Sequence, residues 1–266
     1  MARQYKSGSA KLRPMHPRRV EASPSRHRQA AWRTLAVSLA DAWLPRTCAL
    51  CDQRLRRDEQ GICRPCRDDL PGTHAARCTV CGVVVDAAAQ AGRCVACVRS
   101  QPAFDQTIVL ADYAPPLDRL IVALKFRGEL PLARSLGPAL ADRLRTRALR
   151  TPDLVVAVPL APRRLARRGF NQSQAIARAV ARPLGLRLSA TLLRRERETQ
   201  AQSTLALDAR HANLADAFRC APLRGAGCVV VVDDVMTSGA TLQATADALK
   251  AAGAGFVVNL VAARTP

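Results

Sequence analysis

The sequence predicts an α/β fold, in which a mainly parallel sheet is covered by helices on both faces and a small metal-binding module precedes it. Three observations support this prediction. Apolar segments alternate with amphipathic ones from about residue 104 to the end of the 266-residue chain. The strongest apolar segments are continuous runs, which are typical of strands buried on both faces. Four Cys-x-x-Cys pairs lie ahead of them in the sequence.

The composition allows one such domain and a smaller module. Hydrophobic residues make up 48% of the chain and aromatic residues only 3%, so the core must consist mainly of Ala, Val and Leu. The formal net charge is +20, from 41 Lys and Arg against 21 Asp and Glu. Such a charge attracts phosphates of nucleotides, sugar phosphates, nucleic acids or anionic lipids. An Arg-rich proteome would give the same excess without any such function.

The first 44 residues are predicted to lie outside the α/β domain. Residues 1–29 mix Arg, Ser, Pro and His without periodicity, so we expect a disordered basic tail, with a transit peptide as the alternative. Residues 30–44 predict a short amphipathic helix, because apolar side chains fall near helical spacing at Trp32, Leu35, Leu39, Trp43 and Leu44. No apolar run approaches the ~20 residues that span a bilayer. We therefore expect a cytoplasmic protein without a membrane span.

Eight of the ten cysteines form four regularly spaced pairs. The pairs are Cys48/Cys51, Cys63/Cys66, Cys78/Cys81 and Cys94/Cys97. Two thiolates separated by two residues can turn toward one cation, and four thiolates at ~2.3 Å satisfy a tetrahedral Zn²⁺. The four pairs therefore predict two structural zinc sites, and the short helix and the zinc-binding segment together are assigned to one module, residues 30–100. A disulfide cluster fits poorly, because nothing in the sequence indicates export.

The spacing leaves the grouping of these pairs open. Joining neighbouring pairs is the economical assignment, and interleaving the first with the third and the second with the fourth is the alternative. Gly61, Gly82 and Gly92 are expected to form turns around the pairs. Cys220 and Cys228 stand apart from the pattern and are expected to be buried beside a strand.

The α/β domain is assigned to residues 101–266. Strands are predicted at residues 107–110, 154–158, 228–232 and 256–262, with a further strand within 186–193. Helices are predicted at residues 117–126, 131–147, 171–181 and 242–252. Gly128 and Gly253 are expected to end the helices before them, and Pro183 to stop the third helix. In such a sheet the ligand lies beyond the carboxyl ends of the strands.

The junction after strand 228–232 carries the most informative chemistry. Asp233 and Asp234 follow that strand, and a small-residue loop then opens a helix with Thr237, Ser238, Gly239, Ala240 and Thr241. Backbone N–H groups and hydroxyls at a helix N-terminus suit a phosphate monoester. Two adjacent carboxylates would repel that phosphate, so we expect them to face a vicinal diol or a Mg²⁺ ion. A diol with a 5′-phosphate is ribose 5-phosphate. An ordinary strand–turn–helix with a Thr or Ser cap would make the acid pair a coincidence.

The string Val229–Thr241 resembles the phosphoribosyl-diphosphate loop of type I phosphoribosyltransferases. Two further segments narrow the match: Val158-Pro159-Leu160 followed by Arg168–Ser173, and Arg195-x-Arg197-x-Thr199-x-x-Gln202-x-x-Leu205 followed by Arg210, Asn213, Ala217 and Phe218. With the cysteine pairs upstream, the chain is similar over about residues 44–263 to the ComF family. These are competence-associated, phosphoribosyltransferase-like proteins with an N-terminal double zinc ribbon. The resemblance implies a type I phosphoribosyltransferase-like sheet.

The resemblance also implies roles for particular residues. Pro159 and Leu160 occupy the place of the short loop that contacts diphosphate, and Arg168 is suited to phosphate oxygens. The other arginines of that segment either join Arg168 or form a solvated basic helix. Residues 194–205 match a flexible catalytic loop, in which Arg195 and Arg197 are candidates for stabilising the leaving group. A salt-bridged exposed stretch is the alternative. Lys125 is a further basic candidate near the entrance of the domain.

The implied reaction is a phosphoribosyltransferase (glycosyltransferase) reaction. Ribose 5-phosphate would pass from phosphoribosyl diphosphate, bound with Mg²⁺, to an acceptor, with Asp233 and Asp234 as catalytic residues that hold the ribose. No segment identifies the acceptor. Two alternatives stay open: a non-catalytic module that senses the donor or a nucleotide, and a DNA-uptake protein that engages single-stranded DNA or other uptake proteins through its zinc ribbons and basic surface.

Overall fold

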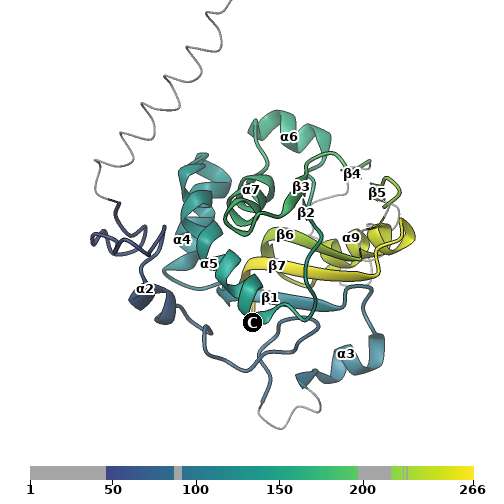
Figure 1. The fold of residues 1–266 in the computed structure, drawn as a ribbon, viewed down its shortest axis with the longest axis horizontal. Coiled ribbons are helices and arrows are strands. Elements are labelled where there is room, and N and C mark those ends of the chain that lie inside the picture. The colour runs from purple at the N-terminus through teal and green to yellow at the C-terminus, as the bar shows by residue number, and fades with distance from the viewer. Residues whose placement is uncertain (1–45, 87–91, 197–216, 224, 226) are drawn as a thin grey trace, which may run out of the picture. The chain divides into compact units, whose positions relative to one another are not determined.

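The computed structural model describes residues 46–86, 92–196, 217–223, 225 and 227–266 (Figure 1). The predicted basic tail, the predicted helix of residues 30–44, Arg197 and the rest of the predicted catalytic loop lie outside these residues. Among the described residues, no helix combines the length and the apolar character that crossing a membrane requires.

Five parallel strands form the central sheet, in the order β1-β7-β6-β2-β3. They are β1 (Gln106–Asp112), β2 (Leu154–Ala157), β3 (Arg187–Ser189), β6 (Cys228–Met236) and β7 (Phe256–Arg264). Strand β6 lies in the middle and is buried at all but one of its positions, as its unbroken run of valines indicates. The predicted α/β class with a mainly parallel sheet is confirmed.

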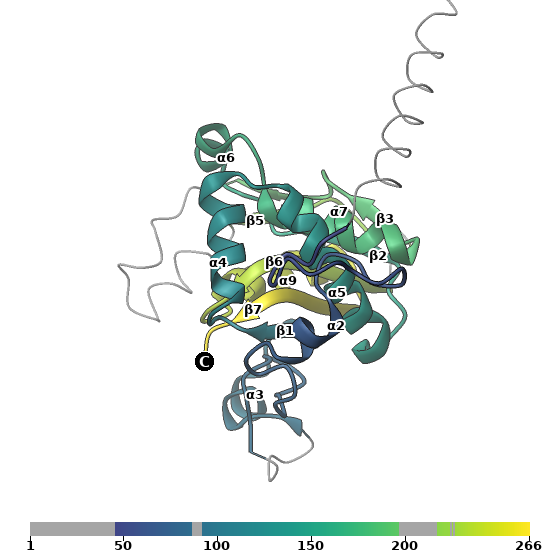
Figure 2. The same cartoon turned by 90° about the vertical axis from the view of Figure 1, so that its left-hand side faces the viewer.

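Helices cover both faces of this sheet (Figures 1 and 2). One face packs against α4 (Leu117–Val122), the π-helix η2 (Ala123–Arg127), α5 (Pro131–Arg147) and α7 (Gln172–Leu184). The other face packs against α9 (Ala240–Ala251). Alternate valines of β6 point to the two faces, so that Val230 and Val232 join the first core and Val229 and Val231 join the second.

Several predicted boundaries are wrong for identifiable reasons. Pro183 does not stop its helix, because α7 continues to Leu184 and ends where Gly185 takes a left-handed conformation with φ +64°. The predicted strand 186–193 is two strands in different sheets, β3 and β4 (Leu193–Arg195). Helix 117–126 changes from α to π after Val122, and Gly128 ends it as predicted, with φ +71°.

Three short elements near the sheet were predicted only in part or not at all. Helix α6 (Pro162–Arg168) follows β2 and lies at the top of Figure 1. Strand β4 pairs antiparallel with β5 (Phe218–Cys220) to form a separate two-stranded ribbon. These three elements are too short for a hydrophobic period to stand out in the sequence. Cys228 is buried as expected, at the start of β6, and Cys220 in β5 is half-buried.

The cysteine-rich segment covers the edge strand β1. It contains α2 (Arg64–Asp68) and α3 (Val95–Ser100). Its backbone bonds β1 directly: the Thr107 N–H donates to the Thr79 carbonyl at 2.9 Å, and the Asp112 N–H to the Pro71 carbonyl at 2.8 Å. An uncovered edge strand would be free to pair with another chain.

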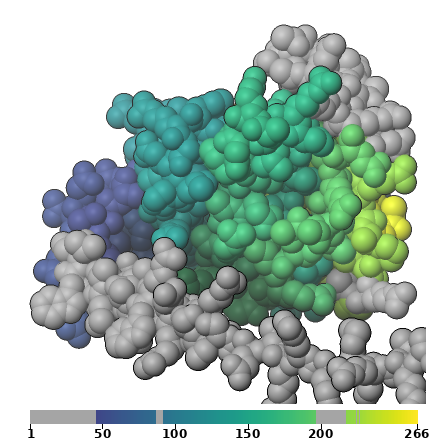
Figure 3. Space-filling view, turned by 90° about the horizontal axis from the view of Figure 1, so that it is seen from above, coloured from purple at the N-terminus to yellow at the C-terminus, as the bar shows by residue number. Residues whose placement is uncertain are grey.

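The two halves of this segment pack on opposite faces of the sheet. Ile62 and Leu70, from the first half, belong to the core with α5 and α7, and Gly61 lies so close to Ser135 of α5 that a Cβ would overlap it. Val80, from the second half, belongs to the core with α9. The segment and the α/β domain therefore share their hydrophobic cores, and Figure 3 shows part of the molecular surface that encloses them.

Candidate functional site

The acid pair lies at the carboxyl end of the central strand, but inside the strand and not after it as predicted. Strand β6 continues through Asp233 and Asp234 to Met236, because β7 pairs with it as far as Arg264. The carboxylates are thereby carried on a paired, buried backbone, which holds them more rigidly than a loop would.

Asp233 is buried and held by two hydrogen bonds to the same oxygen. Its Oδ1 accepts from the Ser173 hydroxyl of α7 at 2.8 Å and from the Asp234 N–H at 2.9 Å. Burial, together with the neighbouring charge of Asp234, raises the pKa of Asp233 to about 7. The pair therefore resists carrying two negative charges unless a cation or hydroxyl donors reach it.

Asp234 presents one oxygen with no hydrogen bond. Its Oδ1 accepts from the Val235 N–H at 2.8 Å. Its Oδ2 is buried and accepts no hydrogen bond from any residue that the structure describes. The ammonium of Lys125, from η2, forms an ion pair with this oxygen at 3.3 Å. Buried polar atoms are rarely left unsatisfied, so Oδ2 is a natural acceptor for a ligand hydroxyl or a cation.

The predicted phosphate loop connects β6 to α9. Gly239 is the N-cap of α9 with φ +83°, so the N-cap residue itself has no side-chain oxygen for the helix N–H groups. The positive φ favours glycine at this position, and the Met236 Cε, at the movable end of its side chain, lies 2.7 Å from where a Cβ would be. A pocket at this point is lined by Asp233, Val235, Met236, Thr237, Gly239, Ala240, Thr241 and Leu242.

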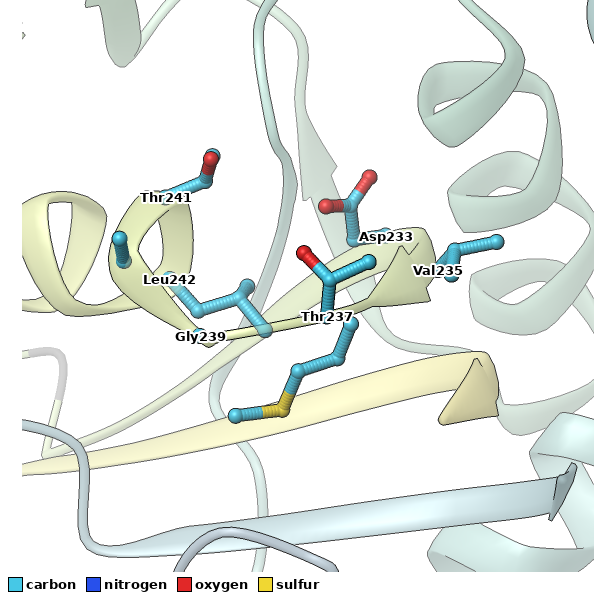
Figure 4. A pocket seen from close by; sticks show the side chains of 8 residues that line it. Asp233, Val235, Thr237, Gly239, Thr241 and Leu242 are labelled. Atoms are coloured by element: carbon cyan, nitrogen blue, oxygen red, sulfur yellow. The ribbon is translucent and has the colours of Figure 1, made fainter. Parts of the chain in front are cut away.

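Figure 4 shows that residues predicted to bind ribose and residues predicted to bind phosphate line the same pocket. The carboxylate of Asp233 and the hydroxyls of Thr237 and Thr241 point to the same side of the loop. Ser238, the remaining member of the predicted set, lies in the loop half-buried, and its Oγ accepts from the Ala240 N–H at 3.4 Å. The structure therefore brings the predicted ribose-binding and phosphate-binding residues together in one place.

The loop after β2 lies beside β6. The Val158 N–H donates to the Val232 carbonyl at 3.0 Å, and Pro159 and Leu160 follow half-buried. The Asn171 amide, which caps α7, donates to the Val158 carbonyl at 3.0 Å. This loop thus follows β2, the strand that pairs with β6 and its acid pair. A loop predicted to contact diphosphate is expected at this place.

Arg168 ends α6 and faces the site. Its guanidinium donates to the buried Gln172 side chain at 2.7 Å and lies 5.6 Å from the Phe126 ring. Burial lowers the pKa of Arg168, and the negative charge of Asp234 opposes that shift. Arg163 and Arg167 are exposed on α6 and Arg164 is half-buried, so they form a basic surface beside the loop.

The predicted catalytic loop is described only at its start. Arg195 lies in β4, and its guanidinium is 5.3 Å from the Phe218 ring of β5. Glu196 forms an ion pair with Arg219 of β5 at 2.6 Å. The proposed contact of Arg195 with a leaving group stays a prediction.

The eight paired cysteines form two groups of four. Neighbouring pairs combine, so that Cys48, Cys51, Cys63 and Cys66 form one group and Cys78, Cys81, Cys94 and Cys97 form the other, with the sulfurs of each group within 4.8 Å of one another. The distances are 3.8 Å from Cys51 to Cys63 and 3.6 Å from Cys81 to Cys94. A tetrahedral site with Zn–S bonds of ~2.3 Å has sulfurs about 3.8 Å apart. The interleaved grouping is therefore wrong, and both groups fit zinc.

Backbone geometry prepares each group for a metal. The Leu50 and Cys63 N–H groups donate to the Cys48 sulfur at 3.4 Å, and the Cys94 N–H donates to the Cys78 sulfur at 3.3 Å. Burial alone would raise the pKa of Cys48 and Cys78, but hydrogen bonds from several backbone N–H groups and from the second cysteine of the same pair lower it to about 7 in each case. Deprotonated thiolates are the metal-binding form. Gly61, Gly82 and Gly92 all have positive φ, as their predicted turn roles require.

Comparison with known proteins matches both parts of the chain. Residues 39–98 match the double zinc ribbon domain, and residues 139–263 match the phosphoribosyl transferase domain. The DNA utilization protein YhgH of Escherichia coli O6:H1 is 36% identical over 219 residues, which cover 80% of this chain and 95% of that protein. Competence protein F of Haemophilus influenzae is 31% identical over 216 residues, covering 77% of this chain and 91% of that protein.

The chain belongs to the ComF family. The family match over nearly the full length of both relatives agrees with the two cysteine groups and the parallel sheet described above. A solved structure, TT1426 from Thermus thermophilus, is 20% identical and covers 50% of this chain and 83% of its own, with a TM-score of 0.30. That score is too low to support an argument.

Two site residues of this ComF-family chain are not assigned a partner by the sequence. In the sequence, Ser173 stands out only as the last residue of the Arg168–Ser173 motif. Lys125 stands out only as a basic residue near the entrance of the α/β domain. The structure brings both to the acid pair, although they come from α7 and η2. The local signal for Ser173 is its place in the first turn of a helix that follows the predicted diphosphate loop.

Proposed function

We propose that this ComF-family protein binds phosphoribosyl diphosphate with Mg²⁺ and transfers its ribose 5-phosphate to an acceptor. The observation that carries the proposal is the acid pair itself. A buried carboxylate oxygen of Asp234 accepts no hydrogen bond from the described residues, and it lies at the end of the strand that leads into a helix N-terminus whose N-cap is glycine. An acceptor for hydroxyls next to a binding site for phosphate suits a ribose 5-phosphate group.

In this proposal the residues divide between the parts of the donor. Asp233 and Asp234 accept from the ribose hydroxyls, and the loop Thr237–Thr241 donates to the 5′-phosphate. The loop at Pro159 and Leu160 and the guanidinium of Arg168 face the diphosphate. The positive charge of the guanidinium stabilises the negative diphosphate as it leaves, while the ribose carbon that it leaves becomes positive. In such transfers a preorganised site that positions the reactants supplies most of the rate enhancement.

Two kinds of metal belong to the proposal. Zn²⁺ would fill the two cysteine groups, in which four thiolates leave no open position for catalysis, so its role is structural. Mg²⁺ would arrive with the diphosphate, whose oxygens it neutralises. The acid pair fits a nearby cation, because burial and mutual repulsion disfavour two charges there and any positive charge relieves that cost.

The test is calorimetric titration with phosphoribosyl diphosphate and Mg²⁺. We expect the unmodified protein to bind and the double variant Asp233→Asn/Asp234→Asn to lose most of its affinity. Asp247→Asn is the matched control, because Asp247 is an exposed carboxylate on α9 with only a Gln243 side chain as its described partner. Absence of binding by the unmodified protein would refute the proposal. Release of diphosphate with candidate acceptors would then test for catalysis.

A second candidate function is the handling of single-stranded DNA, and a basic groove favours it. The groove lies between the first cysteine group and α5, and it is lined by Arg64, Arg67, Asp68, His74, Leu110, Ala139, Asp142, Arg143, Arg145, Thr146 and Arg147. Asp142 is shared by Arg67 at 2.8 Å and Arg145 at 3.0 Å. Burial, with nearby arginines that include Arg147, lowers the pKa of Arg143. This excess of cations suits a phosphate backbone, in keeping with the name of one relative, the DNA utilization protein YhgH.

Salt dependence separates the two functions. Affinity for a labelled single-stranded oligonucleotide should fall steeply with salt, and the variant Arg143→Ala/Arg147→Ala should flatten that slope by roughly 0.7 per lost phosphate contact. Binding of phosphoribosyl diphosphate by the same variant should not change. An unchanged slope for the oligonucleotide would exclude the groove as the contact surface.

A further inference from the structure

A π-helical turn directs Lys125 toward the acid pair. Helix α4 changes to the π-helix η2 at Ala123, and the Gly128 N–H closes the turn on the Ala123 carbonyl. Turns of this kind are rare and are frequently found at functional sites. Gly128 has φ +71° and packs near Phe170, which follows Arg168 and Gly169 in the sequence. The turn is therefore fixed at both ends, and its middle residue is Lys125.

The neighbours of Lys125 set its direction. Leu124 is fully buried in the core that α5 and α7 share, whereas Phe126 is 70% exposed and carries the Arg168 guanidinium over its ring. Between them, the ammonium of Lys125 lies 3.3 Å from Asp234 Oδ2, the oxygen that accepts no hydrogen bond from the described residues. The lysine side chain is 30% exposed, so its stem is held while its ammonium can still reach solvent or a ligand.

The proposed donor would place two of its groups near this ammonium. In phosphoribosyl diphosphate, C1′ carries the diphosphate and the adjacent C2′ carries a hydroxyl. If the ribose hydroxyls bind Asp234, the Lys125 ammonium beside that carboxylate is close to the diphosphate as well. Lysine suits an exchange between the two, because its ammonium has three donors on a flexible stem.

We propose that Lys125 is a positioning residue for the donor: it holds Asp234 in the empty protein, and it passes to the diphosphate when the ribose hydroxyls occupy Asp234 Oδ2. This inference rests on the proposed function, because it assumes that the ribose meets the acid pair. It assigns Lys125 a role that depends on the diphosphate, and that dependence separates it from a residue that merely supports the fold.

The experiment compares two ligands in four proteins. Phosphoribosyl diphosphate with Mg²⁺ and ribose 5-phosphate, which lacks the diphosphate, are titrated by calorimetry into the unmodified protein, Lys125→Met, Lys125→Arg and Arg127→Met. We expect Lys125→Met to bind phosphoribosyl diphosphate at least tenfold more weakly and ribose 5-phosphate as well as before or better, since no ammonium competes for Asp234. Lys125→Arg should restore part of the lost affinity. Arg127→Met removes an exposed cation from the same turn and should change neither affinity.

Each other outcome is decisive. An equal loss for both ligands in Lys125→Met would assign the residue a structural role and overturn the inference, and so would an unchanged affinity for phosphoribosyl diphosphate. If Lys125→Met does not fold, Lys125→Arg carries the test: weaker binding of phosphoribosyl diphosphate with unchanged binding of ribose 5-phosphate would support the inference, and an equal loss for both ligands would overturn it. If the unmodified protein binds neither ligand, the proposed function fails first and this inference with it.

Discussion

Replacing Asp233 by asparagine should make the folded protein less sensitive to pH. The pKa of Asp233 is raised from 3.8 to about 7, chiefly by burial and then by the charge of Asp234. The folded protein therefore binds more protons than the unfolded chain between about pH 4 and pH 7. Its free energy of unfolding must fall as the pH rises through that window. An asparagine side chain does not titrate, so the substituted protein lacks this contribution.

The size of the effect follows from the same shift. Raising the pH from about 5 to about 8 crosses roughly two pH units of the window, each worth about 1.4 kcal/mol. The unmodified protein should thus lose about 3 kcal/mol of stability relative to Asp233→Asn over this range. The substitution keeps the local hydrogen bonds, because Ser173 and the Asp234 N–H both donate to Oδ1, which asparagine retains. The change in relative stability of the two proteins between the two pH values therefore reports the ionisation of Asp233.

The assay is urea unfolding of both proteins at the two pH values, with zinc present throughout. The quantity of interest is the difference in unfolding free energy between the proteins at about pH 8, compared with the same difference at about pH 5. Effects of pH on the cysteine groups are common to both proteins and cancel. A difference that is the same at both pH values would refute the argument that Asp233 titrates near neutrality.

Three further predictions concern the cysteine-rich segment. Metal analysis should find about two zinc ions per chain, and a strong chelator should lower the thermal midpoint, because four thiolates per site are structural; metal-free protein with an unchanged midpoint would contradict this. Arg264→Met should weaken phosphoribosyl diphosphate binding several-fold without loss of zinc, since this guanidinium donates to the Cys81 carbonyl at 3.3 Å and to the Met236 carbonyl, just before the phosphate loop, at 3.4 Å; calorimetry and metal analysis check both parts. Gly61→Ala should cost at least about 1 kcal/mol more stability than Gly185→Ala, because both have positive φ but only Gly61 would place a Cβ against Ser135, 2.2 Å from its carbonyl oxygen; equal losses in urea unfolding would show that the contact yields.

A largely buried ion pair links the cysteine-rich segment to the edge strand β1. Arg77 of the cysteine-rich segment forms an ion pair with Asp112 of β1 at 2.6 Å, and both side chains are largely buried. Breaking a pair of this kind leaves an uncompensated charge. We therefore expect loss of metal from the second cysteine group to expose the edge of β1, which favours pairing with other chains.

The sequence by itself determined the features that depend on local pattern. The alternation of apolar strands with amphipathic helices predicted the parallel α/β sheet, and the predicted helix of residues 131–147 matches α5 at both ends. The Cys-x-x-Cys spacing predicted two metal sites, and the Thr-Ser-Gly-x-Thr string predicted a loop that opens α9. Each of these is set within a few residues of chain, where periodicity and turn chemistry act directly.

Only the tertiary structure decided which distant groups meet. The length of β6, and with it the rigid placement of Asp233 and Asp234, depends on pairing with β7, which no property of β6 alone reveals. The approach of Lys125 and Ser173 to the acid pair depends on helices packing on one face of the sheet, and the grouping of the cysteines depends on how their turns fold back. Contacts between residues far apart in the chain follow from burial of the whole core. The sequence could therefore suggest a ligand for the acid pair, but it could not identify the side chains that hold the pair in place.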